Sequence, residues 1–65
     1  MKITYDPAAD ILSVVLRDAV VVESDEDKPG IILDYDGTGA LVALEILDAS
    51  KNVEGVSSVE FKVAV

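Results

Sequence analysis

The stretch that decides the fold is "DYDGTGALVALE", residues 34–45. It fits two structures that exclude one another, the calcium loop of an EF-hand and the turn of a β-hairpin. The side chains that would supply calcium ligands at loop positions 1, 3, 5 and 12 are Asp34, Asp36, Thr38 and Glu45. As a hairpin, the Asp-Gly pair is a tight turn between two apolar strands.

The flanking residues favour the hairpin. An EF-hand loop follows a helix, but Pro29-Gly30 comes just before Asp34, and the intervening "IIL" is good strand sequence. With the turn centred on Gly37-Thr38, Asp34 faces Leu41 and Glu45 faces Gly30.

This register would keep the two outer carboxylates apart. At a rise of about 3.3 Å per residue, Glu45 lies about 13 Å along the sheet from Asp34. Calcium ligands sit at about 2.4 Å, so the pair cannot share an ion. We therefore expect no metal site and no cofactor, with a weak cation site at Asp34, Asp36 and Thr38 as the remaining alternative.

The rest of the chain predicts a single small, mainly β domain over residues 1–65. Valine, isoleucine and leucine occur in short runs broken by Asp, Gly and Pro, which is a strand pattern. We expect an antiparallel β-meander of about five strands, with at most one short helix near residues 48–53, capped by Asp48 or Ser50. The expected strands are "MKITY", "ILSVVLR", "AVVVES", "IILDYD", "ALVALEIL" and, as a sixth, "SVEFKVAV".

The segment "ALVALEIL", residues 40–47, is apolar on both faces. An antiparallel sheet with one solvated face should alternate instead, so something covers the second face. The candidates are the chain's own curled sheet, its C-terminal strand 56–65, or a second subunit, and we favour a homodimer or a stable complex. Whether strand 56–65 pairs within or between subunits stays open.

Composition excludes several classes of function. The chain has no cysteine and no histidine, so thiol chemistry, disulfides and the usual general base are missing, and we expect no enzyme. Thirteen acidic residues against five basic ones give a net charge of −8, which disfavours direct binding to nucleic acid or to anionic membranes. No apolar run is long enough to span a bilayer, and we expect a cytoplasmic protein.

Few residues are candidates for a site. Asp6 and Asp10 bracket a turn and are expected to hold it by hydrogen bonds. Glu45, inside an apolar strand, is either a general acid or base with a raised pKa or, as we favour, a cross-strand partner of a Lys or Arg or a solvent-facing side chain. The predicted acidic loop after "AVVVES" is a docking patch for a basic partner or simply a solvated loop. The candidate partner-binding residues are Glu23, Asp25, Glu26, Asp27 and Glu45.

Two motifs point to a family. The start "YDPAAD" and the segment "EILDAS", which follows the "DYDG" hairpin, resemble a family of short acidic prokaryotic proteins catalogued as a domain of unknown function. The resemblance covers about residues 1–51. It implies a small β domain without an established activity, and an antitoxin-like or accessory role beside toxin-like proteins. The chain departs from the pattern at Ala8 and at the outward positions Ser13 and Val15.

Two functions are therefore expected. The first is a protein-interaction module, antitoxin-like, acting as a homodimer or with a basic protein partner. The alternative is a small-ligand or divalent-cation binding domain that uses the acidic hairpin turn.

Overall fold

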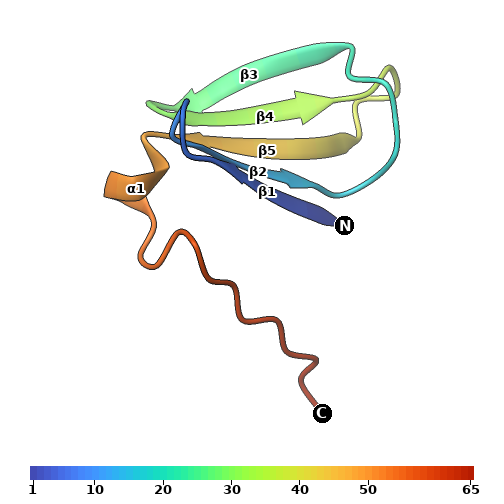
Figure 1. The fold of residues 1–65 in the computed structure, drawn as a ribbon. Coiled ribbons are helices and arrows are strands. Elements are labelled where there is room, and N and C mark those ends of the chain that lie inside the picture. The colour runs from blue at the N-terminus through green and yellow to red at the C-terminus, as the bar shows by residue number, and fades with distance from the viewer.

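The computed structural model describes residues 1–65 and contains one sheet and one short helix (Figure 1). Its elements are β1 (Lys2–Asp6), β2 (Ile11–Val15), β3 (Glu23–Lys28), β4 (Ile31–Tyr35), β5 (Leu41–Leu47) and α1 (Ala49–Asn52). The expected single sheet with one short helix after it is confirmed.

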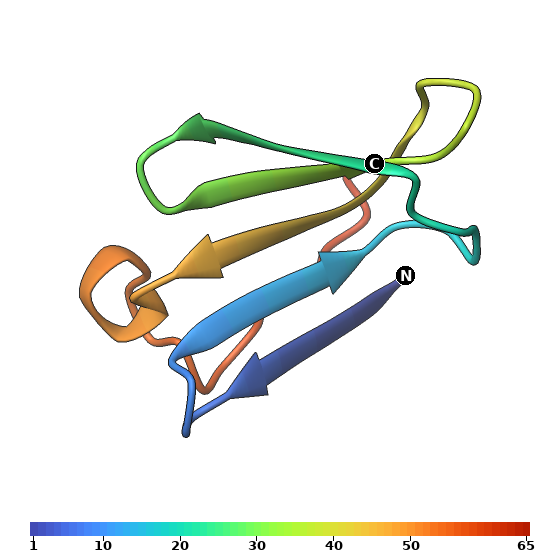
Figure 2. The same cartoon turned by 90° about the horizontal axis from the view of Figure 1, so that it is seen from above.

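All strand pairs are antiparallel, in the order β1-β2-β5-β4-β3. β1–β2 and β3–β4–β5 each meander, and a long connection over residues 16–22 carries the chain from β2 to the far edge beside β4 (Figures 1 and 2). β5 is therefore the central strand, and β1 and β3 are the two edges.

The third strand lies later in the sequence than predicted. Most of "AVVVES" forms the connection, whose valines Val20, Val21 and Val22 are exposed. The backbone N–H groups of Leu16 and Arg17 donate to the carbonyl of Val42 and that of Val22 donates to Tyr35, so both ends are fixed to the sheet. The chain must cross the end of β5 and β4 here, and this outweighs the strand preference of valine.

The acidic residues 23–28 form β3 itself, which corrects the predicted acidic loop. β3 pairs with the apolar strand β4 from Glu23 opposite Tyr35 to Lys28 opposite Ile31, and a bulge lies between Glu26 and Lys28. As an edge strand, β3 keeps its carboxylates in water while its backbone completes the ladder.

The β4–β5 hairpin is confirmed, but its register differs from the expected one. Asp34 lies opposite Ala43 and Glu45 opposite Ile32, because the connection spans residues 36–40 and a bulge falls between Asp34 and Tyr35. Gly39 adopts a φ of 84° that favours glycine, and its N–H donates to the carbonyl of Asp36. Because of this shift, Glu45 lies closer to Asp34 than the predicted separation of about 13 Å.

The helix α1 is capped from a distant part of the chain. Neither predicted cap acts: Asp48 makes no side-chain capping bond, and Ser50 lies within the helix. Instead the Asp10 carboxylate accepts the backbone N–H of Ser50 at 2.9 Å and its hydroxyl at 2.7 Å.

Residues 58–65 form no sixth strand. They run away from the sheet in an extended conformation (Figure 1), and every one of them is exposed. Phe61 is 71% exposed and Val63 is 78% exposed. The alternating pattern predicted a strand, but a strand needs a partner, and within one chain this segment pairs with none.

The chain buries little of itself. Only Asp34, Val42, Ala43 and Ala49 are buried. The sheet is thus a single layer, with one short helix at one end and no second layer of secondary structure.

Candidate protein-interaction surfaces

The strand register sorts the side chains of the sheet into two faces, since directly paired residues point the same way. One face carries two apolar rows that run across β1, β2, β5 and β4. We call this the apolar face, and its residues are Ile3, Val14, Leu44 and Leu33 in one row and Tyr5, Leu12, Ile46 and Ile31 in the other.

The chain covers the apolar face only in part. None of its eight residues is buried, and Ile3 is 39% exposed. Leu44 lies at its centre, on the central strand between Val14 and Leu33. At β3 the two rows end in Asp25 and Lys28.

The molecule also exposes more surface than a compact chain of its mass. A folded monomer of 6.9 kDa has an accessible surface of about 4,000 Å². This chain exposes 4917 Å². The C-terminal residues 58–65, which project from the sheet and are all exposed, contribute to this excess of about 900 Å².

The opposite face, which we call the polar face, brings Asp34 and Glu45 together. Its two rows are Lys2, Val15, Ala43, Asp34 and Ser24, and Thr4, Ser13, Glu45, Ile32 and Glu26. They are diagonal neighbours on β4 and β5, and hydrogen bonding to Asp34 raises the pKa of Glu45, with burial and the Asp34 charge acting in the same direction. The Ser24 hydroxyl donates to Asp34 at 2.6 Å. Of the two favoured interpretations of Glu45, the pairing with a Lys or Arg is wrong, because its neighbours are Asp34, Ser13 and Ile32. The other, a side chain that points to solvent, holds only in part, because Glu45 is half-buried.

The acidic edge carries the other predicted partner-binding residues. Every residue of β3 is exposed, and the strand holds four carboxylates in six residues, Glu23, Asp25, Glu26 and Asp27. Glu45 lies apart from these four carboxylates, because Ile32 separates it from Glu26 in the same row of the polar face.

In the acidic hairpin turn, the Asp36 carboxylate already binds donors of the chain itself. The Asp36 carboxylate accepts from the Thr38 N–H and hydroxyl and from the Ala40 N–H, and it forms an ion pair with Arg17. These donors hold the pKa of Asp36 well below its usual range, the Thr38 hydroxyl first among them. Asp34 instead binds Ser24, so the three residues of the weak cation site do not converge. The structure holds no group of three or more acidic side chains placed to bind a metal ion.

The two sequence motifs meet at Asp10. Tyr5 donates its hydroxyl to Asp10 at 2.8 Å, and Ser50 donates its N–H and hydroxyl to the same carboxylate. These bonds, from Ser50 first and then Tyr5, lower the pKa of Asp10. Asp6 accepts the N–H groups of Ala8 and Ala9, as expected for a turn. Sequence reasoning missed the long-range contact, for which only the co-occurrence of the two motifs gave a signal.

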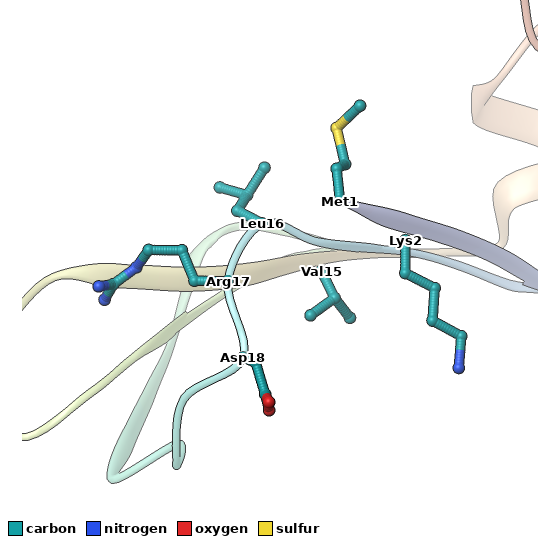
Figure 3. Close-up of a pocket in the computed structure, with 6 residues that line it drawn as sticks. All are labelled: Met1, Lys2, Val15, Leu16, Arg17 and Asp18. Atoms are coloured by element: carbon teal, nitrogen blue, oxygen red, sulfur yellow. The ribbon is translucent and has the colours of Figure 1, made fainter.

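One hollow opens where β1 begins and β2 ends. Met1 and Leu16 point to one side of the sheet there, and Lys2 and Val15 point to the other (Figure 3). The hollow therefore wraps around the edge of the sheet and is open to solvent. Its remaining lining residues are Arg17 and Asp18.

The fold and surfaces define a small antiparallel β-sheet protein with an open apolar face. The model of the family described as "Protein of unknown function (DUF2283)" matches residues 2–50, and the chain belongs to this family. The match ends within α1, so the extended C-terminal segment lies outside it. No curated protein and no solved structure matches the chain. Its one helix lacks the length and apolar character needed to cross a membrane.

Proposed function

We propose that this domain is a protein-interaction module that acts as a homodimer, with the apolar faces of two copies packed against one another. The observation that carries the proposal is an eight-residue apolar face, centred on Leu44, in which the chain buries none of the eight side chains. Two sheets stack face to face at about 10 Å, and their interleaved side chains then form a core. A second copy supplies a surface of the right chemistry and size.

The acidic edge supports a second part of the proposal, a basic protein partner. The carboxylates of β3 lie beyond the apolar rows and stay in solvent when the faces pack. Basic segments would be attracted to this edge, and the attraction would be screened by salt. An antitoxin-like role, in which the partner is a small basic toxin, falls within this class.

The role of the apolar face is tested with two variants, each of which adds one carboxylate to a different face of the sheet. Leu44→Glu places a carboxylate at the centre of the apolar face, whereas Thr4→Glu adds the same charge at an exposed position on the polar face. Burying two unpaired carboxylates in one dimer is costly, so Leu44→Glu should weaken dimerisation at least about a hundredfold. Thr4→Glu should leave it close to that of the unaltered protein. Sedimentation equilibrium measures both.

A milder variant guards against loss of the fold. Val14→Thr keeps the shape of the side chain and replaces one methyl group by a hydroxyl on the apolar face. The dissociation constant should therefore rise by about tenfold or more while the circular dichroism spectrum is retained. An unaltered protein that sediments as a monomer throughout, or a dimer indifferent to both variants, contradicts the proposed dimer.

The basic partner is tested by affinity purification from a prokaryotic lysate at low and high salt. The expected result is a stoichiometric basic protein that is recovered at low salt and lost at high salt. Reversing the charges of Asp25 and Asp27 to Lys should abolish its recovery. Recovery of the chain's own subunits alone at both salts argues against this partner and leaves the dimer standing.

A further inference from the structure

The C-terminal segment, residues 58–65, is the longest part of the chain without a structural role. Its apolar residues alternate with polar ones, so in an extended chain Val59, Phe61, Val63 and Val65 share one side. All four are exposed, and nothing in the chain covers them. Such a segment can add as an edge strand to a sheet that has one apolar and one polar face.

We propose that this segment is an arm that adds to the β1 edge of a second copy of the chain. The inference rests on the homodimer proposed above and deepens it, because it names a second contact between the same two subunits. Strand addition would satisfy the backbone of the arm through main-chain hydrogen bonds and place its apolar side in line with the apolar face.

β1 accepts such an arm better than β3 does. β1 pairs with β2 through five regular positions without a bulge, and it presents Ile3 and Tyr5 on the apolar side. β3 carries four carboxylates and a bulge, which are the features that prevent edge pairing. Glu60 of the arm would meet further negative charge there.

The position of α1 directs the arm toward the partner. Tyr5 belongs to the apolar face and reaches the Asp10 carboxylate, which in turn holds Ser50 of α1. The helix therefore lies toward the side of the apolar face, and the segment after it runs away from its own sheet (Figure 1). Seen from above, the same segment passes beneath the sheet (Figure 2). A second sheet packed on that face lies about 10 Å away, on the side toward which the arm projects.

The extended arm also indicates that its partner is another copy. Its own β1 edge is free, yet residues 58–65 make no backbone hydrogen bond to it: the backbone bond of Ser58 goes to Gly55. An arm that joins the second subunit would bury apolar surface at both ends of the interface.

The test places one charge on either side of the arm in the full chain. Phe61→Asp adds a carboxylate to the apolar side, and Ser58→Asp adds the same charge to the polar side. Neither side chain supports the fold of the subunit, since both are exposed. Phe61→Asp should raise the dimer dissociation constant at least about a hundredfold, because two buried phenylalanines are lost per dimer. Ser58→Asp should change it little.

Hydrogen exchange then identifies the strand that receives the arm. In the dimer, the β1 amides that point away from β2 should exchange more than about tenfold slower than in Phe61→Asp, and the exposed amides of β3 should be unchanged. Mixing ¹⁵N-labelled Phe61→Asp with an excess of unlabelled, unaltered chain should restore protection to β1 of the labelled subunit. That restoration shows that the arm comes from the partner.

The possible failures are distinguishable. A dimer whose affinity is unchanged by Phe61→Asp, with freely exchanging β1 amides, overturns the arm and leaves the apolar-face dimer intact. β1 amides that are protected in the unaltered protein but stay unprotected in the labelled variant after mixing show that the arm binds its own chain, which also overturns the inference. A monomer at every concentration means that the proposed function itself has failed.

Discussion

Asp10 binds Ser50, which lies forty positions away in the chain. Its φ of 56° is a left-handed conformation that Asp and Asn tolerate better than other non-glycine residues. The carboxylate then serves three donors, from Tyr5 and Ser50, and so connects the β1–β2 turn to α1. The two sequence segments "YDPAAD" and "EILDAS" each contain a partner in this network, which gives their residues a structural explanation.

At Asp10, Asp10→Ala should lower the melting temperature more than Asp10→Asn does. The alanine removes all three acceptor contacts and strains the backbone, whereas asparagine keeps an acceptor oxygen and tolerates the same φ. Thermal unfolding followed by circular dichroism compares the two variants. Equal melting temperatures for the two variants would contradict this explanation, because only the alanine removes every acceptor and strains the backbone.

The raised pKa of Glu45 predicts that the free energy of unfolding depends on pH. Its folded pKa is raised, so between the unfolded value of about 4.3 and the folded value the folded state binds more protons than the unfolded state. The free energy of unfolding therefore falls as pH rises through this window, and the loss is complete above it. Glu45→Gln keeps a hydrogen bond to Asp34 without the second charge, so this contribution disappears.

The measurement is the difference in melting temperature between Glu45→Gln and the unaltered protein at a series of pH values. The difference should grow in favour of the variant from about pH 4 upward and then level off. Asp10 and Asp36, whose pKa values are lowered, destabilise both proteins equally in acid and cancel in the difference. A difference that does not change with pH would mean that the two carboxylates do not interact.

Among the elements, the β4–β5 hairpin shows how far the sequence determines the fold. The Asp-Gly turn and the flanking strands were predictable from turn chemistry, but the register was not. A five-residue connection and a bulge shift the pairing by two positions, and neither has a distinct residue pattern. That shift is what brings Glu45 within reach of Asp34.

The hairpin also gives a matched glycine pair. Gly39 has a φ of 84° and free space where a Cβ would lie, so Gly39→Ala meets only backbone strain and should destabilise the fold by about 1–2 kcal/mol. Gly37 has no positive φ, and Gly37→Ala should be neutral or slightly stabilising. Urea unfolding measures both, and equal effects would contradict this account of the turn.

β3 and the C-terminal segment were predicted incorrectly for opposite reasons. The acidic sequence of β3 has low strand preference, but its backbone pairs with β4, and tertiary context decides. The segment "SVEFKVAV" has high strand preference and no partner in the chain. Of the candidate surfaces, the apolar character of β5 was visible in the sequence, whereas the extent of the apolar face depends on the register of four strands.

As a whole, the molecule combines an open apolar face with a high negative charge. Dimerisation brings together two subunits of charge −8, so their repulsion opposes association and salt should relieve it. The homodimer should therefore tighten as the salt concentration rises, while a basic partner should bind more weakly. Sedimentation equilibrium at several salt concentrations tests the first trend, and a dimer that weakens with salt would indicate that charge pairs hold it.

The most direct test of the central claim is an isotope-filtered NOE measurement on a mixture of labelled and unlabelled chains. Packing of the two apolar faces predicts intersubunit NOEs among the methyl groups of Leu12, Leu33 and Leu44, and none from Val15 on the polar face. Intersubunit NOEs from the polar face alone, or none from any methyl group at millimolar protein, would contradict the claim that the apolar face is buried between two copies.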